Sequence, residues 1–399
     1  MAGANSFLLK QTQLPTRGRA LVASQSLEAG QVLLQEAPLL AYLDAHTASA
    51  NTVCFHCTRP DLNPNPNGNG SWSFCTTCQV AAFCSPQCAA AASTSTHTPF
   101  VCRALSLLVL CTLDFDSQTQ ARYLIAAYNL AVVSPHCFEQ LLSLEGEGSV
   151  NDKIHLVHTF LSEAIRSWQL ECQELPSWSV EFVASLIAKD QRNGFGLSTF
   201  VPDTRLRKIR AYAIYAQASF FNHDCLPNAC RFDYIDKPGV GNTDIIIRCL
   251  HDIAEGVEVC ISYFPVNWRF AERQGKLREE YGFECRCDRC KIEEGWSDEE
   301  NGEKGDEISV DGEASEEEDE AMKNTDEEEG MDGEGDGQGS FPHAMFFMRY
   351  LCPRESCGGT LAPLPPHGVS SSVMECNVCG ELRSEEDFLQ EIQEHKVSP

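Results

Sequence analysis

The side chains best suited to chemistry in this sequence lie together at residues 219–230, Ser-Phe-Phe-Asn-His-Asp-Cys-Leu-Pro-Asn-Ala-Cys. The rings of Phe220 and Phe221 favour burial, and Asn222 and His223 follow them directly. Because a buried polar group is costly unless it is hydrogen-bonded, we expect this Asn-His pair to face a partner, either another part of the protein or a ligand.

A thiol in the same stretch indicates a metal site. Cys225 has no neighbouring cysteine at metal-binding spacing, but three more thiols follow sixty residues later in Cys285-Arg-Cys287-Asp-Arg-Cys290. Together they make the four soft ligands that a structural zinc ion takes. The sequence therefore predicts a zinc site that pins the later segment against the Asn-His pair.

Two further segments have the cysteine spacing of zinc sites. Seven cysteines and one histidine between residues 54 and 102 suffice for two tetrahedral sites, and a CxxxxC and a CxxC knuckle near the C-terminus suffice for a zinc ribbon. Each set is complete and leaves no position open for water, so all of this zinc, about four ions, is predicted to be structural. The predicted ligands are Cys54, Cys57, Cys75, Cys78, Cys84, Cys88, His97 and Cys102 in the first segment and Cys352, Cys357, Cys376 and Cys379 in the second.

Three motifs occur in the order typical of SET-domain lysine methyltransferases. Residues 222–228 resemble the family's NHSCxPN motif, residues 256–263 resemble its GEEL-x-I-x-Y strand, and residues 285–290 resemble its post-SET CxCxxC. The cysteine-rich segment makes the chain similar to those SET proteins that carry an inserted MYND zinc finger. The resemblance covers residues 1–290.

The resemblance implies how the finger cysteines pair and which residues bind and catalyse. One zinc would take Cys54, Cys57, Cys84 and Cys88, and the other would take Cys75, Cys78, His97 and Cys102. The implied cofactor is S-adenosylmethionine, held by Arg17, Gly18, Arg19, His158, Asn222, His223, Tyr281 and Phe283. The implied catalytic residues are Tyr263 and Tyr281. Three bland alternatives stay open: a plain glycine turn at 17–19, an ordinary partly buried histidine at 158, and an edge-strand tyrosine at 263.

Methyl transfer from a sulfonium to an amine needs a bound donor, a neutral lysine and alignment of the two, with no covalent intermediate. A narrow aromatic channel helps, because desolvation disfavours the ammonium form of the lysine. Asp224 replaces the usual Ser and Val257 replaces the usual first Glu, and neither change removes a group that does chemistry. We therefore expect a protein-lysine N-methyltransferase; the alternative is a zinc-finger adaptor with an inactive or weakly active SET domain.

The expected fold is α+β: a β-rich SET fold with an inserted MYND zinc finger, a helical SET insertion and a C-terminal zinc ribbon. Apolar residues recur at helical spacing between residues 103 and 190, which predicts the helical insertion. The expected segments are 1–50 for the N-terminal part of the SET domain, 51–102 for the finger, 103–190 for the helical insertion, 191–265 for the SET core, 266–291 for the post-SET segment, 292–340 for an acidic disordered linker, 341–385 for the ribbon and 386–399 for the tail.

Charge and composition limit the classes of partner that we expect this chain to bind. The net charge is −28, and residues 293–338, with 22 acidic residues against two lysines, account for −20 of it. Such a strip suits a basic protein segment, such as a histone tail or another lysine-bearing target, and repels nucleic acid. Residues 85–101 hold no Lys or Arg, so DNA binding by the finger is doubtful and a peptide ligand is favoured. No apolar run is long enough for a membrane span, and clustered cysteines without a signal pattern indicate the nucleus or the cytoplasm.

Calorimetry with S-adenosylmethionine separates the enzyme from the adaptor. We expect the wild-type protein to bind it and Asn222→Ala to bind it more weakly, because the amide belongs to the implied cofactor loop. A wild-type protein that gives no binding heat would favour the adaptor.

Overall fold

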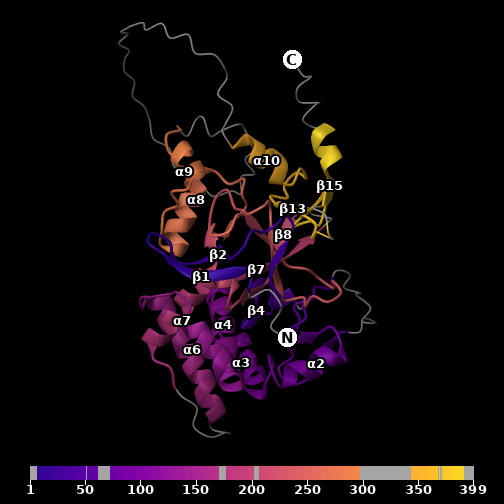
Figure 1. Cartoon of the computed structure of the whole chain (residues 1–399). Coiled ribbons are helices and arrows are strands. Elements are labelled where there is room, and N and C mark those ends of the chain that lie inside the picture. Colours follow the sequence, from indigo (N-terminus) through magenta and orange to yellow (C-terminus); the bar gives the residue numbers. More distant parts are fainter. Residues whose placement is uncertain are drawn as a thin grey trace, which may run out of the picture.

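The computed structural model describes residues 7–50, 52–61, 72–169, 177–201, 206–296, 343–366, 368 and 371–390. A core of short β-sheets lies in the middle of the molecule, with a layer of helices on one side and the post-SET and C-terminal segments on the other (Figure 1). Nearly all of the predicted acidic linker, from residue 297 onward, lies outside the described residues.

The two ends of the SET segment pair with each other. Strand β1 (Leu9–Leu14) forms a hairpin with β2 (Gly18–Ala23), and β3 (Val32–Glu36) pairs with β11 (Ile245–Cys249), which also pairs with β10 (Ala229–Phe232). Similar glycine turns precede the strands at both ends of the segment. Leu27 and Ile253, which lie in these turns, exchange backbone hydrogen bonds of 2.8 and 2.9 Å. The two turn-and-strand units, far apart in the sequence, thus lie side by side.

A second sheet carries the chain from the helices to the site. It has the order β4 (Leu40–Leu43), β8 (Leu206–Ile214) and β7 (Gly194–Val201), all antiparallel. A short 3-10 turn, η1 (Ala218–Phe220), leads from β8 into β9 (Asn222–His223), which pairs in parallel with β12 (Cys260–Ile261). This parallel pairing sets the Asn-His pair beside the strand that ends just before Tyr263.

The helical layer consists of α3 (Pro99–Val109), α4 (Phe115–Val133), α5 (Pro135–Leu142), α6 (Asp152–Gln169) and α7 (Val180–Asn193). Three of these helices have an N-cap side chain that accepts a backbone N–H: Thr98, Asp114 and Ser179. Such caps satisfy donors that the first turn of a helix leaves free. The sequence analysis predicted a helical insertion over residues 103–190, and the helices begin slightly earlier, at Pro99, and end at Asn193.

The cysteine-rich insertion is small. It contains the hairpin β5 (Ser73–Phe74) and β6 (Ala82–Phe83), followed by α2 (Pro86–Ser93), whose N-cap Ser85 accepts from the Cys88 backbone. Helix α1 (Ala45–Ala50) connects β4 to it. Cys78, Ala81, Phe83 and Ala92 form its own small apolar core, a size at which bound metal normally supplies stability.

The segment after β12 folds back over the sheet as α8 (Phe270–Lys276), the short π-helix η2 (Leu277–Tyr281) and α9 (Asp288–Glu293). Gly282 follows with φ +76°, a conformation that glycine adopts without strain and that turns the chain after Tyr281. The segment therefore places Tyr281 beside the sheet and then continues into the cysteines at 285–290.

The C-terminal segment packs against β11 and the turn before β3. It comprises α10 (Ala344–Tyr350) and an antiparallel sheet of β13 (Leu361–Pro363), β14 (Val373–Cys376) and β15 (Leu382–Ser384). The contact is close enough that a Cβ on Gly30 would lie 2.4 Å from the Leu364 carbonyl oxygen. The buried Arg248 guanidinium pairs with Glu375 at 3.0 Å, and Glu375 also accepts from the Tyr234 hydroxyl at 2.9 Å. No helix in the described part of the chain is long and apolar enough to span a membrane.

Removing the charge that joins the C-terminal sheet to the core should be costly. Glu375→Ala leaves Arg248 buried without its partner, and breaking such a pair typically costs about 3–5 kcal/mol. Glu381→Ala is the matched control, because its pair with Arg354 is exposed and worth about 1 kcal/mol or less. Denaturant unfolding should separate the two variants, with zinc content measured in both. Equal losses of stability in Glu375→Ala and Glu381→Ala would contradict a stabilising role for the Arg248–Glu375 pair.

Candidate active site

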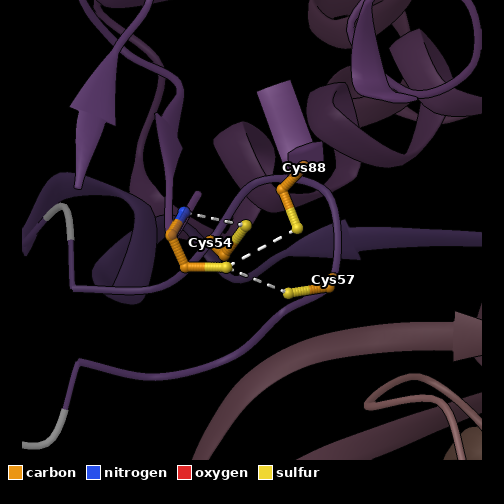
Figure 2. A group of neighbouring side chains, drawn as sticks. Cys54, Cys57 and Cys88 are labelled. Carbon is orange, nitrogen blue, oxygen red and sulfur yellow. Dashed lines mark hydrogen bonds between the residues drawn. The ribbon is translucent and has the colours of Figure 1, made fainter. Parts of the chain in front are cut away.

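The structure gathers the predicted metal ligands into four groups of four, and within each group the ligand atoms all lie within 4.8 Å of one another. A tetrahedral zinc ion with Zn–S bonds of about 2.3 Å sets its sulfur atoms about 3.8 Å apart. The sulfur–sulfur distances fit: Cys57–Cys84 and Cys75–Cys102 are 3.6 Å, and Cys352–Cys379 is 3.7 Å. In the first group, Cys54, Cys57 and Cys88 point toward one common centre (Figure 2).

The group nearest to the Asn-His pair joins Cys225 to the post-SET cysteines. The Cys225 sulfur lies 3.5 Å from that of Cys290 and 3.9 Å from that of Cys285. Arg273, fully buried, donates to the Cys225 sulfur at 3.2 Å and to the Cys290 sulfur at 3.7 Å. Four thiolates around one divalent zinc leave a net charge of −2, so a buried guanidinium is the complement that this donor set requires.

The ring of His223 connects these cysteines to Tyr263. Its Nδ1 accepts the Tyr263 backbone N–H at 3.2 Å, so the ring proton sits on Nε2, which lies 3.2 Å from the Cys225 sulfur. The ring is buried, and burial lowers the pKa of His223 to about 3, in keeping with a neutral imidazole that donates to a thiolate. Both ring nitrogens are thus engaged inside the protein. The ring thus connects the Cys225 cysteine group to Tyr263. The resemblance had implied that His223 contacts the cofactor.

Tyr263 lies at the end of this chain of contacts. Its hydroxyl donates to the Phe221 carbonyl at 3.0 Å, and its ring centroid lies 4.7 Å from that of Tyr281. Burial raises the pKa of both phenols, of Tyr281 to about 12, so both stay protonated at physiological pH. The Phe283 ring lies 6.5 Å from that of Tyr281 and is partly exposed. The three rings form an aromatic cluster between β12 and the post-SET segment.

Both tyrosines line a large groove of about 990 Å³. Its walls come from α4 and α7 of the helical layer, from the β7–β8 hairpin and from the η2 turn. Residues of the helical layer therefore form one wall. Six carboxylates and four cations line the groove: Asp44, Asp116, Glu147, Asp190, Glu279 and Glu280, against Lys153, Arg192, Arg231 and Lys276.

The floor of the groove holds hydrogen-bond acceptors. The Asp190 carboxylate accepts from the Tyr42 hydroxyl at 2.7 Å, and burial raises the pKa of Asp190 to about 7. Nearby on α4, the buried Oε1 of Gln120 has no hydrogen-bond partner among the described residues. These positions suit a donor-rich ligand. Sequence reasoning missed them because neither residue belongs to a recognisable motif.

Asn222 holds the glycine turn at 17–19. Its Nδ2 donates to the Arg17 and Arg19 carbonyls at 3.3 and 3.2 Å and to Glu258 at 2.8 Å. Arg17 donates to the His223 carbonyl at 2.7 Å. At Gly18 (φ +70°) a Cβ would meet nothing within 4 Å, so open space lies beside this turn. Asn222 and Arg17 therefore fix the turn against β9.

His158 and Arg19, both implied as cofactor contacts, bond to other parts of the protein. His158 lies on α6, and its Nε2 bonds the Trp178 carbonyl at 2.9 Å; it does not line the groove, so the plain alternative for it accounts for the contact. Arg19 instead pairs with Glu145 at 3.0 Å, and the Asn193 amide donates to the Glu145 carbonyl at 2.7 Å. Glu145, in the α5–α6 connection, was missed because nothing in the sequence near it marks a site.

Comparison with known proteins agrees with this geometry. Residues 18–264, more than half of the chain, match the SET domain family. Histone-lysine N-methyltransferase ASHR2 of Arabidopsis thaliana is 44% identical over 403 residues, which cover 95% of this chain and 96% of that protein. The chain belongs to the SET-domain family of protein-lysine methyltransferases. It is SMYD-like: a SET and MYND domain-containing protein of Dictyostelium discoideum is 26% identical over 70% of this chain and 59% of its own length.

Among solved structures, the SET domain of LSMT bound to lysine and AdoHcy is a distant neighbour of this SET-domain chain. It is 14% identical, with a TM-score of 0.30, and the match covers 71% of this chain and 54% of that one. A likeness of this size carries no argument about ligands.

The buried Asp190 should make the stability of this SET-domain protein depend on pH. A carboxyl whose folded pKa lies above its unfolded value of about 3.9 binds a proton more readily in the folded state, so the stability it contributes is lost as pH rises from about 4 to 7. Asp190→Asn keeps an acceptor for Tyr42 without the charge. Its gain in stability over wild type should grow between pH 5 and 7 and then level off.

Thermal unfolding of both proteins across this pH range measures the difference. Glu139→Gln, an exposed change on α5, is the control and should track the wild type at every pH. A gain for Asp190→Asn that does not vary with pH would rule out titration of this carboxyl.

Proposed function

We propose that this chain transfers a methyl group from S-adenosylmethionine to the Nζ atom of a lysine in a protein. The observation that carries the proposal is the buried Tyr263 hydroxyl on the wall of the large groove, fixed through His223 to the post-SET cysteine group. S-adenosylmethionine, when bound, supplies an electrophilic methyl group on sulfur. Family membership supports this donor.

The chain's own residues orient the acceptor and keep it neutral. The rings of Tyr263, Tyr281 and Phe221 line one end of the groove, and a lysine side chain among them loses hydration. Desolvation disfavours the ammonium form, so the amine releases its proton more easily and its lone pair becomes available. The Tyr263 hydroxyl and the Phe221 carbonyl, already hydrogen-bonded to each other, supply fixed dipoles at this end.

The substrate class we propose is a basic protein segment, in a histone or in a non-histone protein. The acceptors in the groove floor, Asp190 and Gln120, suit lysine or arginine side chains near the target lysine. The excess of carboxylates around the groove favours approach of a positively charged chain. The similarity to a protein named as a histone-lysine methyltransferase also supports this class.

The cysteine groups complete the proposal as structural zinc sites. We assign residues 51–102 to a MYND-type finger with a peptide as its ligand class, and 341–385 to a zinc ribbon; the remaining segment boundaries stay as the sequence predicted them. The four complete, closely grouped ligand sets support zinc, and their closed coordination supports a structural role. The twenty cysteines in the described part of the chain are free thiols, in keeping with nucleus or cytoplasm.

Loss of the Tyr263 hydroxyl tests the proposal most directly. Tyr263→Phe should lower kcat at least about 100-fold, a loss typical of removing one positioned polar group at a reacting centre, while binding of S-adenosylmethionine changes little. The assay is transfer of labelled methyl to proteins of a cell extract and to purified histones. Tyr350→Phe, a buried tyrosine on α10 away from the groove, is the control and should keep its activity.

The outcomes separate the candidate functions. Equal labelling by wild type and Tyr263→Phe would remove this tyrosine from the mechanism. Wild-type protein that labels nothing would favour the zinc-finger adaptor instead.

A further inference from the structure

A second cavity, of about 230 Å³, lies between the cysteine-rich insertion and the helical layer. Its walls come from α3, α4 and β4, with Phe55 and residues 95–96 of the insertion closing one side. The lining is largely apolar, with Leu105, Ile125 and Leu130 among its side chains. Pockets for drug-sized ligands span about 300–1,000 Å³, so this cavity fits a smaller molecule.

Arg122 on α4 lines this cavity and is 93% buried, because only 7% of its surface is exposed. Its Nε and Nη1 atoms have no hydrogen-bond partner, and it forms no ion pair with any carboxylate in the described part of the chain. Burial lowers the pKa of Arg122 to about 10, and the charge of Asp44 opposes this, so the guanidinium remains cationic at physiological pH. An unpaired buried cation of this kind is costly to the fold.

The other buried polar groups of the cavity already have partners. The Asn129 amide donates to the Ser95 carbonyl at 2.6 Å, and its oxygen accepts from Thr98 at 2.6 Å. Thr96 is hydrogen-bonded to His56 at 3.0 Å. Arg122 is therefore the group in this cavity whose hydrogen-bonding capacity the described residues leave unmet.

We infer that this cavity binds a small amphiphile: an apolar body of modest length with one anionic head group that pairs with Arg122. The apolar walls provide the burial that such a body needs, and the guanidinium provides a bidentate partner for a carboxylate. A neutral apolar molecule would leave the cation unpaired, and a strongly polar anion would leave the walls uncovered. The site lies outside the methyltransferase groove and does not depend on the proposed function.

The position of the site places it directly behind the groove. Tyr42 lines both spaces, with its hydroxyl on Asp190 in the groove floor, and α4 contributes Gln120 to the groove and Arg122 to the cavity. A molecule in the cavity therefore packs against the back of the wall that faces the proposed substrate.

Calorimetry with sodium octanoate tests the inference on the full-length, zinc-loaded protein. We expect saturable binding of one octanoate per chain, with hexanoate about tenfold weaker, because each buried methylene is worth about three- to fourfold in affinity, or about 0.8 kcal/mol. 1-Octanol, which lacks the charge, should bind at least about tenfold more weakly than octanoate, as expected for loss of a charge-assisted hydrogen bond.

Two variants separate the head group from the walls. Arg122→Met removes the cation and should weaken octanoate at least tenfold, while the ligand-free protein becomes no less stable, because the guanidinium Nε and Nη1 have no hydrogen bond to lose. Ala126→Leu fills the cavity with the guanidinium intact and should also abolish binding. Arg166→Met, exposed on α6, is the charge-matched control and should bind as the wild type does.

Three results would overturn the inference. They are no saturable octanoate binding by the folded wild type, undiminished binding by Arg122→Met, and octanol binding as tightly as octanoate. A loss of ligand-free stability in Arg122→Met would assign the arginine to the fold rather than to a ligand.

Discussion

The hydrogen bonds of the His223 ring are the constraint on which the site depends. One ring nitrogen accepts from the Tyr263 backbone and the other donates to the Cys225 sulfur, so a residue at the reacting centre and a metal ligand share one rigid side chain. The Cys225 sulfur is in turn fixed by the post-SET cysteines and by the buried Arg273. The position of Tyr263 is thereby coupled to the Cys225 cysteine group through a single side chain.

Much of this arrangement could be predicted from the sequence, because it depends on residue types and on short spacings between them. Zinc needs four soft ligands, so counting them predicted the number of sites, and the resemblance implied how the finger ligands pair into the groups that the structure brings together. Helical periodicity predicted the layer between residues 103 and 190. Tyr263 was found because it ends a strand with a recognisable pattern.

The remainder depends on packing between residues far apart in the chain, which no local pattern encodes. Both nitrogens of the His223 ring bond within the protein, because the Cys225 sulfur and the Tyr263 backbone N–H lie on either side of the ring. Asp190 became a buried acceptor only because Tyr42, from a distant strand, lies over it. His158, which the resemblance implied as a cofactor contact, lies on α6 against the Trp178 carbonyl, a contact that no local pattern indicated.

The long-range strand pairing also governs how this chain is made. Strand β3 finds its partner only when β11 has been synthesised, and β9 only when β12 has, so the early strands leave the ribosome with open edges. Helices α3 to α7 make mostly local contacts and can assemble while these edges wait. Until the later strands are made, the earlier ones have unpaired β-edges, the kind of surface that favours aggregation.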